Sequence, residues 1–276
     1  MSTGHRSAGV GAPAAIGTQS PRAMFSPTQI EQFQRDGYIV MRALAPDVLR
    51  RQMLDVARAH LASAIGPVEY EADVQYPGAP PSHEAPGGRT VRRLLQACAR
   101  DPVFREWATS PALAAPLAQL LGTPVELSQT HHNCVMTKDP RYSSLTNWHR
   151  DIRYWSFERP ELVSVWLALG QERYENGCLL VLPGTHVMDF APAQLDSAQF
   201  LRTDVEANRA VLARQVAVEL DPGDVLFFHC RLFHAAGHNQ TAETKFSVVH
   251  TYHAPDNRPL PGSRSAALPD VPLQIS

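Results

Sequence analysis

The spacing of apolar residues divides the chain into a helical first part and a strand-rich second part. Between residues 25 and 122, apolar side chains recur every three or four positions, as at Leu49, Met53, Ala57 and Leu61. That spacing places them on one face of a helix, which we expect to face the core. Beyond Pro124 the apolar residues instead form short runs separated by turn residues, which is typical of strands.

The predicted helices begin at recognisable capping sequences. Ser26 can cap a helix whose first position is Pro27, and Gln29 completes a capping box. Gly37 is expected to end that helix. A short strand is predicted at 38–41, and further helices are predicted after Pro46, Asp101-Pro102 and Ser110-Pro111, the last ending at Gly122.

The second half of the chain predicts a mainly β fold with flanking helices. Turn signals such as Asn176-Gly177, Pro183-Gly184 and Asp221-Pro222-Gly223 separate the apolar runs. Helices followed by many short strands favour a β-barrel or a double-sheet jelly roll with helices packed outside. The expected strands are 125–136, 162–169, 179–182, 216–220, 225–229 and 246–252.

The same pattern predicts one domain behind an N-terminal tail. Residues 1–24 contain no acidic residue and several glycines, and we expect a disordered tail rather than a transit peptide. Residues 25–276 would form one domain: a helical part (25–122), a jelly-roll core (about 123–254) and a C-terminal extension (255–276). The Pro- and Gly-rich stretch 70–90 is predicted to be a lid or a disordered loop.

Composition excludes several classes of protein. The 276 residues are 44% hydrophobic and 19% charged, with a net charge of −2, so a nucleic-acid footprint is not expected. No apolar run reaches the roughly 18 residues that span a bilayer, and we expect a cytoplasmic protein without a membrane partner. The scattered cysteines form no C-x-x-C pair, which argues against a zinc knuckle.

The strongest candidate for chemistry is the sequence Trp148-His149-Arg150-Asp151. On a strand, alternate residues point to the same side, so His149 and Asp151 could direct an imidazole and a carboxylate at one point. A second histidine would complete a two-histidine, one-carboxylate metal site, which leaves three positions open on Fe(II). We choose His234 for this role, although the residues alone leave three competitors, His229, His238 and His250.

Several motifs together resemble the phytanoyl-CoA dioxygenase family. They are QFQRDGY at 32–38, WHRD at 148–151, NGCLLVLPGTH at 176–186, Gly223-Asp224 and HAAGHN at 234–239. The likeness runs from about residue 25 to residue 252. It implies a double-stranded β-helix, or jelly roll, that binds Fe(II) and uses 2-oxoglutarate and O2.

The resemblance also assigns roles to individual residues. It implies that His149, Asp151 and His234 are the metal ligands and catalytic residues, whereas His186 belongs to a loop motif and is not a ligand. Trp166 and Cys134 correspond to positions that line the co-substrate pocket. The implied reaction oxidises a small organic substrate while 2-oxoglutarate is decarboxylated to succinate. Because Asp151 is present, we expect hydroxylation rather than halogenation, with desaturation or ring formation still open.

Two positions depart from the family pattern. Lys245 stands where the family usually has an arginine that clamps the distal carboxylate of 2-oxoglutarate, and lysine lacks the bidentate fork. Ala236 replaces a frequent serine, which removes a hydrogen bond of about 1 kcal/mol. We expect Lys245 to pair with the co-substrate, and Arg92 or Arg93 is a candidate compensating cation.

The substrate and two rival functions stay open. Residues 152–157 alternate aromatic side chains that could line the substrate pocket, with Arg153 meeting an anionic group, or they could form a packed strand. Residues 142–144 could form a loop over its entrance. The rivals are a non-catalytic jelly roll that binds a small ligand and a zinc-dependent cupin-like hydrolase or isomerase. Oligomeric state is not readable from the sequence.

Overall fold

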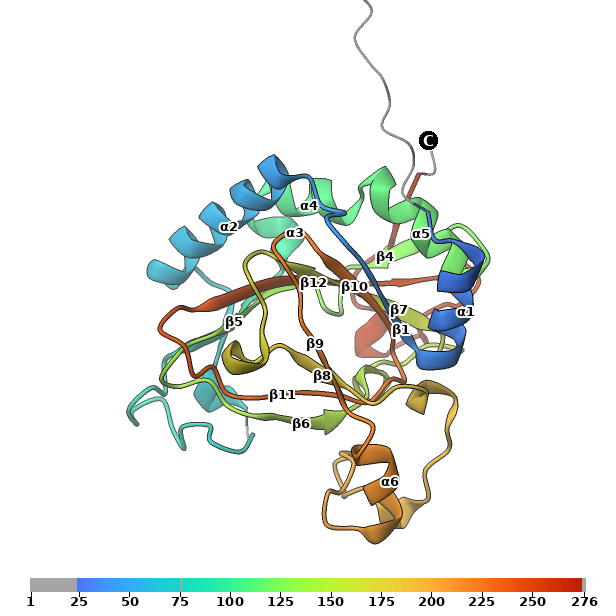
Figure 1. The fold of residues 1–276 in the computed structure, drawn as a ribbon. Helices are drawn as coiled ribbons and strands as arrows, with labels where there is room; N and C mark the ends of the chain where they lie inside the picture. Colours follow the sequence, from blue (N-terminus) through green and yellow to red (C-terminus); the bar gives the residue numbers. More distant parts are fainter. Residues whose placement is uncertain (1–23, 75, 275–276) are drawn as a thin grey trace, which may run out of the picture.

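The computed structural model describes residues 24–74 and 76–274, and it contains two antiparallel sheets with helices outside the larger one (Figure 1). The predicted N-terminal tail lies outside the described residues, except for Met24. The larger sheet has nine strands and the smaller has four. This arrangement confirms the mainly β jelly roll with flanking helices.

The larger sheet carries strands from both halves of the chain. Its path runs β1-β10-β7-β12-β5-β3-β2, and β4 pairs with both β12 and β13. The bounds are β1 (Tyr38–Met41), β2 (Val68–Tyr70), β3 (Val91–Leu95), β4 (Glu126–Ser128), β5 (Cys134–Lys138), β7 (Leu162–Ala168), β10 (Val225–His229), β12 (Lys245–His253) and β13 (Val271–Pro272).

The smaller sheet brings together the strands that carry the two candidate histidine ligands. Its order is β6-β11-β8-β9, with β6 (Thr146–His149), β11 (His234–Ala236), β8 (Leu179–Val181) and β9 (Val216–Val218). A core cluster that includes Trp166, Val181, Leu226 and Val249 fills the space between the two sheets.

Four of the helices form where the sequence predicts them, whereas two were not predicted. Helix α1 (Pro27–Asp36) begins with the Ser26–Gln29 capping box, and Gly37 ends it with φ +80°. A side chain at Gly37 would also collide with His186, because its Cβ would lie 2.5 Å from the imidazole Nδ1. The other predicted helices are α2 (Asp47–Ala62), α4 (Pro102–Ala108) and α5 (Pro111–Leu121), whereas α3 (Ala97–Arg100) and α6 (Arg209–Leu212) were not predicted.

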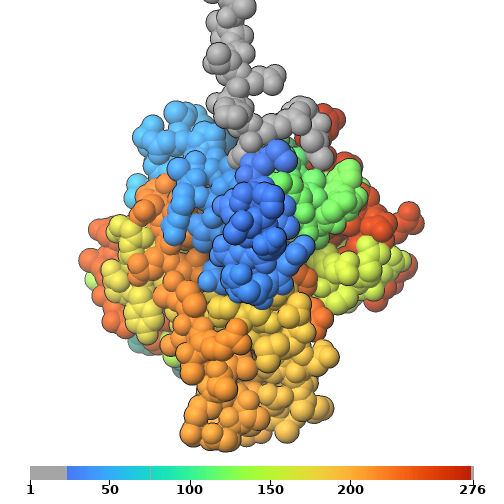
Figure 2. Space-filling view, turned by 45° about the vertical axis from the view of Figure 1, so that its right-hand side comes forward, coloured from blue at the N-terminus to red at the C-terminus, as the bar shows by residue number. Residues whose placement is uncertain are grey.

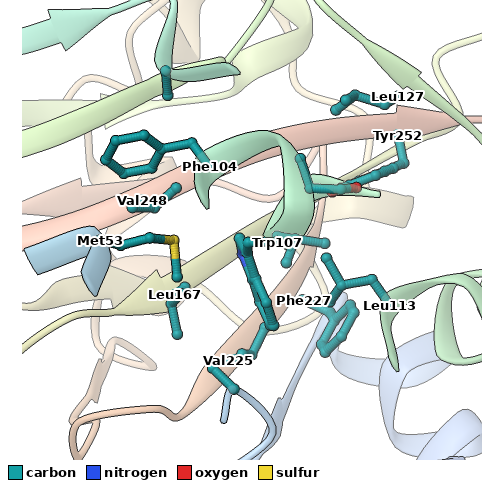
Figure 3. Close-up of a cluster of buried hydrophobic side chains, with 14 of the residues drawn as sticks. Met53, Phe104, Trp107, Leu113, Leu127, Leu167, Val225, Phe227, Val248 and Tyr252 are labelled. Carbon is teal, nitrogen blue, oxygen red and sulfur yellow. The ribbon is translucent and has the colours of Figure 1, made fainter. Parts of the chain in front are cut away.

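A second core joins the helices to the outer face of the larger sheet (Figure 3). Met53 of α2 and Trp107 of α4 are fully buried there against Leu167, Phe227 and Val248 of the sheet. This packing confirms that the apolar stripe of α2 faces the core. It also leaves the inner face of the sheet free to line a site. On the opposite side of the molecule, the segment around α6 stands out from the body (Figures 1 and 2).

The structure corrects several predicted boundaries. The predicted strand 125–136 is two strands, β4 and β5, with a connecting segment between them that carries His131 and His132. The sequence patterns also missed β2, β3, β11 and β13, which are two to five residues long. Runs this short carry too few alternations to separate a strand from a loop.

The stretch predicted to be a lid is only partly irregular. It contains a 3-10 turn at Glu71–Asp73, and its flanks β2 and β3 pair with each other and join the larger sheet through β5. Among the described residues, no helix is long and apolar enough to cross a membrane.

Candidate active site

Three side chains that are far apart in sequence converge at one end of the smaller sheet. His149 is the last residue of β6 and His234 is the first residue of β11, and the two are direct partners across these antiparallel strands. Asp151 Oδ1 lies 3.8 Å from His149 Nε2 and 3.5 Å from His234 Nε2. All three residues are buried, and their ligand atoms lie within 4.8 Å of one another. They form a geometry suited to a single metal ion.

Asp151 reaches this point by a route that the sequence did not predict. It is not on the strand but is the first residue of a 3-10 helix, Asp151–Tyr154. The chain turns directly after β6, and the Ile152 backbone N–H donates to the Cys230 carbonyl. The alternation argument for the His149–Asp151 pair was therefore wrong in its local geometry, although the two side chains do converge.

Both imidazoles present the same nitrogen to the metal position. The Nδ1–H of His149 donates to the Asn147 carbonyl at 2.8 Å, and the Nδ1–H of His234 donates to the Leu232 carbonyl at 3.0 Å. A backbone acceptor at Nδ1 fixes the tautomer and leaves the Nε2 lone pair for a metal. The orientation of both rings is thus set before a metal binds.

The Asp151 carboxylate is held ionised by its neighbours. Burial alone would raise its pKa, but His132 and His234 hold the pKa of Asp151 well below its usual range. Ser164 donates to Asp151 Oδ2 at 3.2 Å, and His132 Nε2 lies 3.3 Å from Oδ1. In the same cluster, burial, with His234 nearby, lowers the pKa of His149 to about 3. Burial alone would lower the pKa of His234, but Asp151 raises it, so metal binding at His234 must release a proton, whereas His149 is already neutral.

The competing histidines lie elsewhere. His229 faces His186 across a ring distance of 5.3 Å, and His250 is within hydrogen-bonding distance of the Cys98 thiol. The His238 imidazole contacts the Ser143 carbonyl. None of them approaches Asp151 within the ion-pair range that His132, His149 and His234 share.

A cavity beside the metal position is lined by four cationic side chains. They are Arg92, Arg93, Lys138 and Lys245, and they share the cavity with His149 and His234 and with apolar side chains such as Met136, Leu179 and Phe228. β3, β5 and β12 carry these cations, and all three strands belong to the larger sheet. The cavity is therefore suited to an anion next to a metal.

Lys245 lies in this cavity, but the protein itself supplies an anionic partner for it. Its ammonium lies 3.1 Å from Oε2 of Glu172, a fully buried carboxylate. Trp166 Nε1 donates to Glu172 Oε1 at 2.9 Å, and Ser247 Oγ donates to the same oxygen at 2.5 Å. The charge of Lys245 is thus already neutralised within the protein.

Lys138 is the cavity cation that has no carboxylate partner in the described part of the chain. It is 8% exposed, and its Nζ donates to the Ser144 carbonyl at 3.0 Å. Among the described residues, no carboxylate lies within 4.0 Å of this ammonium, although each of the other three cavity cations has one. Burial, with Arg92 and Lys245 nearby, lowers the pKa of Lys138 to about 7. A bound anion beside Lys138 would favour the protonated ammonium and so offset the cost of burying its charge.

The remaining predicted co-substrate residues divide into two groups. Trp166, Ala236 and Arg92 line the cavity with Lys245. Cys134 belongs to the same core cluster as Trp166 and Ala236 but is not among the residues that line the cavity, and its Sγ lies 3.7 Å from Met136 Sδ. Met136, two residues further on the same face of β5, reaches the cavity in its place.

Of the two segments predicted to lie at the substrate pocket, residues 152–157 do not line the cavity. Residues 152–157 do not form a strand, and Trp155 and Phe157 pack in a separate core cluster with Leu162 and Cys230. Arg153 lies 4.1 Å from the centroid of the Phe200 ring, outside the cavity lining.

The loop at 142–144 contributes through its buried serines. Ser144 accepts a hydrogen bond from Arg92 and, through its carbonyl, one from Lys138. This loop therefore holds two cavity cations in place.

Three residues of the site were not identified from the sequence. Glu172, Lys138 and His132 carry no local motif, and each is recognisable only by what it contacts in the folded chain. His132 has φ +47°, an unusual conformation for a residue other than glycine, and such strain is often found at functional sites.

The fold and the site define a class of protein. A jelly roll that holds two imidazoles and one carboxylate on one face of a metal position, with a cationic cavity beside it, is a non-haem iron oxygenase scaffold. The donor set fits Fe(II), because it binds the metal while leaving adjacent positions open for other ligands.

Comparison with known proteins places the chain in a family. The family model described as phytanoyl-CoA dioxygenase (PhyH) matches residues 33–247, so the chain belongs to this family and is an iron- and 2-oxoglutarate-dependent dioxygenase. A probable phytanoyl-CoA dioxygenase of Caenorhabditis elegans is 25% identical over 79% of this chain and 72% of its own. An ectoine dioxygenase of Sphingopyxis alaskensis is 28% identical over 86% and 78%.

A solved structure supports the fold. The crystal structure of EctD from S. alaskensis in its apoform superposes with a TM-score of 0.71 at 22% identity, covering 88% of this chain and 81% of that one.

Proposed function

We propose that this protein hydroxylates a small, anionic organic molecule, with His149, Asp151 and His234 as the iron ligands. The observation that carries the proposal is the position of these ligands at a cavity lined by Arg93 and three further cationic side chains. Bound iron would supply the activation of O2 and the oxidation of a C–H bond, coupled to decarboxylation of 2-oxoglutarate. The protein would position the iron and the substrate, supply charged groups that bind the ligands, and exclude water from the cavity.

The charges of the buried residues match the proposed ligands. The four cavity cations have three carboxylate partners, Glu69, Glu71 and Glu172, which leaves one positive charge. A bound Fe(II) ion with two positive charges, beside the single negative charge of Asp151, would leave a second positive charge. A bound 2-oxoglutarate dianion would neutralise both, so an anionic group of the substrate would be held by the hydrogen bonds of Arg93 and not by a remaining net charge. Buried charges are stable when they are paired, so this balance favours a dicarboxylate co-substrate.

We assign the distal carboxylate of the co-substrate to Lys138 together with Lys245. The two residues are direct partners across β5 and β12, so their side chains leave the sheet on the same face. Lys245 is neutralised by Glu172, whereas no carboxylate of residues 24–74 and 76–274 pairs with Lys138. The larger share of the attraction would therefore come from Lys138, and Lys245 would supply a further hydrogen-bond donor.

Arg93 is the proposed contact for an anionic group of the substrate. It lines the cavity, and its carboxylate partner Glu69, 3.3 Å from its Nε, is shared with Arg92. Arg92 is already engaged with the hydroxyls of Ser144 and Thr146. A planar guanidinium with free N–H groups suits a carboxylate or phosphate group.

The test is a substrate screen with the purified protein, Fe(II), 2-oxoglutarate and ascorbate under air. Small carboxylates and phosphorylated compounds would be compared with matched amides and alcohols. Succinate release should rise with an anionic compound, and the product should gain the mass of one oxygen atom.

Two controls make the screen decisive. Asp151→Ala should release no succinate, and Arg93→Leu should raise the KM for the organic substrate while leaving the KM for 2-oxoglutarate within about twofold. Turnover of neutral compounds alone would refute the assignment of an anionic substrate. Zinc-supported turnover without O2 would refute the oxygenase itself.

A further inference from the structure

A second group of metal-binding side chains lies at the opposite end of β12 from Lys245. His253 is the last residue of β12, and it is a direct partner of Glu126 on β4. Asp270 immediately precedes β13, which pairs with β4 on the other side. One nitrogen or oxygen from each of these three residues lies within 4.8 Å of the others, and His253 Nε2 is 3.2 Å from Asp270 Oδ2.

The buried imidazole of His253 directs Nε2 into this group, where it makes an ion-pair contact, but no hydrogen bond of good geometry, with Asp270. The residue is 1% exposed, and its Nε2 has no hydrogen-bond partner among the described residues. Asp270 Oδ1 is also buried without a hydrogen-bond partner there. Buried polar atoms without partners are uncommon, because each one loses its hydration without compensation. A cation in this group would give Asp270 Oδ1 a partner and would give His253 Nε2 a bond of good geometry.

The His253 ring is oriented in the same way as the two histidine ligands of the active site. Its Nδ1–H donates to the Ala254 carbonyl at 2.9 Å, just as the Nδ1–H groups of His149 and His234 donate to backbone carbonyls. In each case Nε2 is left facing a carboxylate. A hydrogen bond of this kind at Nδ1 is the usual way in which a metal-ligating histidine is held.

We propose that Glu126, His253 and Asp270 bind a divalent cation of the zinc type at a site distinct from the active site. One imidazole and two carboxylates are suitable zinc ligands, and water would complete a tetrahedral set. With bond lengths of about 2.0–2.2 Å, two ligand atoms of a tetrahedral zinc site lie about 3.4 Å apart. The His253–Asp270 distance of 3.2 Å is close to that value.

The site would fasten the C-terminal segment to the sheet. β4 and β12 belong to the body of the fold, whereas Asp270 belongs to the segment that follows β12. The same segment carries Ser265, whose hydroxyl lies 2.7 Å from His131 Nε2. His131 directly precedes His132, which contacts the Asp151 carboxylate. Cation binding would thus stabilise a segment that packs behind the active site without taking part in the reaction.

The competing explanation is a plain ion pair between a protonated His253 and Asp270. A zinc titration of the whole protein distinguishes the two. The active site would first be disabled by His149→Ala and His234→Ala, and the protein would be stripped with a chelator and dialysed against Zn2+ or Co2+. We expect one zinc per chain by mass spectrometry of the metal, a zinc-dependent rise in Tm, and visible absorption bands from bound Co2+.

Asp270→Asn is the informative variant, and Asp256→Asn is its control. Asp256 lies in the same segment but is exposed and pairs only with Arg159 among the described residues. Asp270→Asn should weaken zinc binding at least tenfold and abolish the zinc-dependent rise in Tm, whereas Asp256→Asn should change neither.

Two results would overturn the proposal: folded protein that retains no zinc, or zinc binding that is undiminished by Asp270→Asn. If the disabled background does not fold, the same measurement in the otherwise unaltered protein should fall from two zinc ions per chain to one in Asp270→Asn. If Asp270→Asn in the otherwise unaltered protein still bound two zinc ions per chain, the proposed site would also be refuted.

Discussion

Replacing Lys138 by methionine tests the proposed binding of the co-substrate most directly. Methionine preserves the length and much of the volume of the side chain but removes the ammonium. A hydrogen bond to a charged group contributes about 1.5–3 kcal/mol. Lys138→Met should therefore raise the KM for 2-oxoglutarate roughly 10- to 150-fold. The kcat at saturating 2-oxoglutarate should change much less, because the residue does not contact the metal ligands.

The pH dependence provides a second, independent readout. Burial lowers the pKa of Lys138 to about 7, so in the free protein this lysine is protonated below pH 7 and increasingly neutral above it. A bound carboxylate favours the protonated form, and binding above pH 7 must therefore take up a proton. The KM for 2-oxoglutarate should rise between pH 7 and pH 8.5, at most about tenfold per pH unit.

Steady-state kinetics with succinate detection would measure both effects, and Lys138→Arg is the matched control. Arginine stays protonated throughout this range, so the rise in KM with pH should disappear while affinity near pH 7 is largely retained. An unchanged KM in Lys138→Met, or a KM that falls with increasing pH in the unaltered protein, would show that another cation holds the co-substrate.

Three further perturbations test the site and the fold. Lys245→Met should destabilise the protein by about 3–5 kcal/mol in chemical denaturation, because it leaves the buried Glu172 carboxylate without its cationic partner. Adding Glu172→Gln should recover part of that loss. Additive losses of stability from the two substitutions would contradict the energetic coupling between Lys245 and Glu172. Asp151→Ala should lose both stoichiometric iron and succinate release, and retained iron would refute its assignment as a ligand. Gly37→Ala should destabilise the protein by at least about 1–2 kcal/mol, which is the cost of the left-handed backbone alone, and so lower its Tm. The loss should exceed that cost because the added Cβ would also collide with His186. An unchanged Tm would contradict this packing.

The sequence by itself determined the features that depend on short-range interactions. The capping box at Ser26, the left-handed Gly37 and the apolar stripe of α2 are local, and all were predicted correctly. The proposed ligands His149, Asp151 and His234 could be named because of family motifs, and the structure brings them together. Spacing alone did not place them: Asp151 is on a 3-10 turn, and nothing in the residues separated His234 from three other histidines.

Only the tertiary structure decided how charge is distributed around the metal position. Lys245 and Lys138 look alike in the sequence, yet one is paired with Glu172, 73 positions away, and the other has no carboxylate within reach in the described chain. The physical reason is that the strength of an ion pair depends on distance and burial, and strand pairing between distant segments sets both. Local sequence patterns carry no record of that pairing, so the cation that a ligand would neutralise becomes visible only in the folded chain.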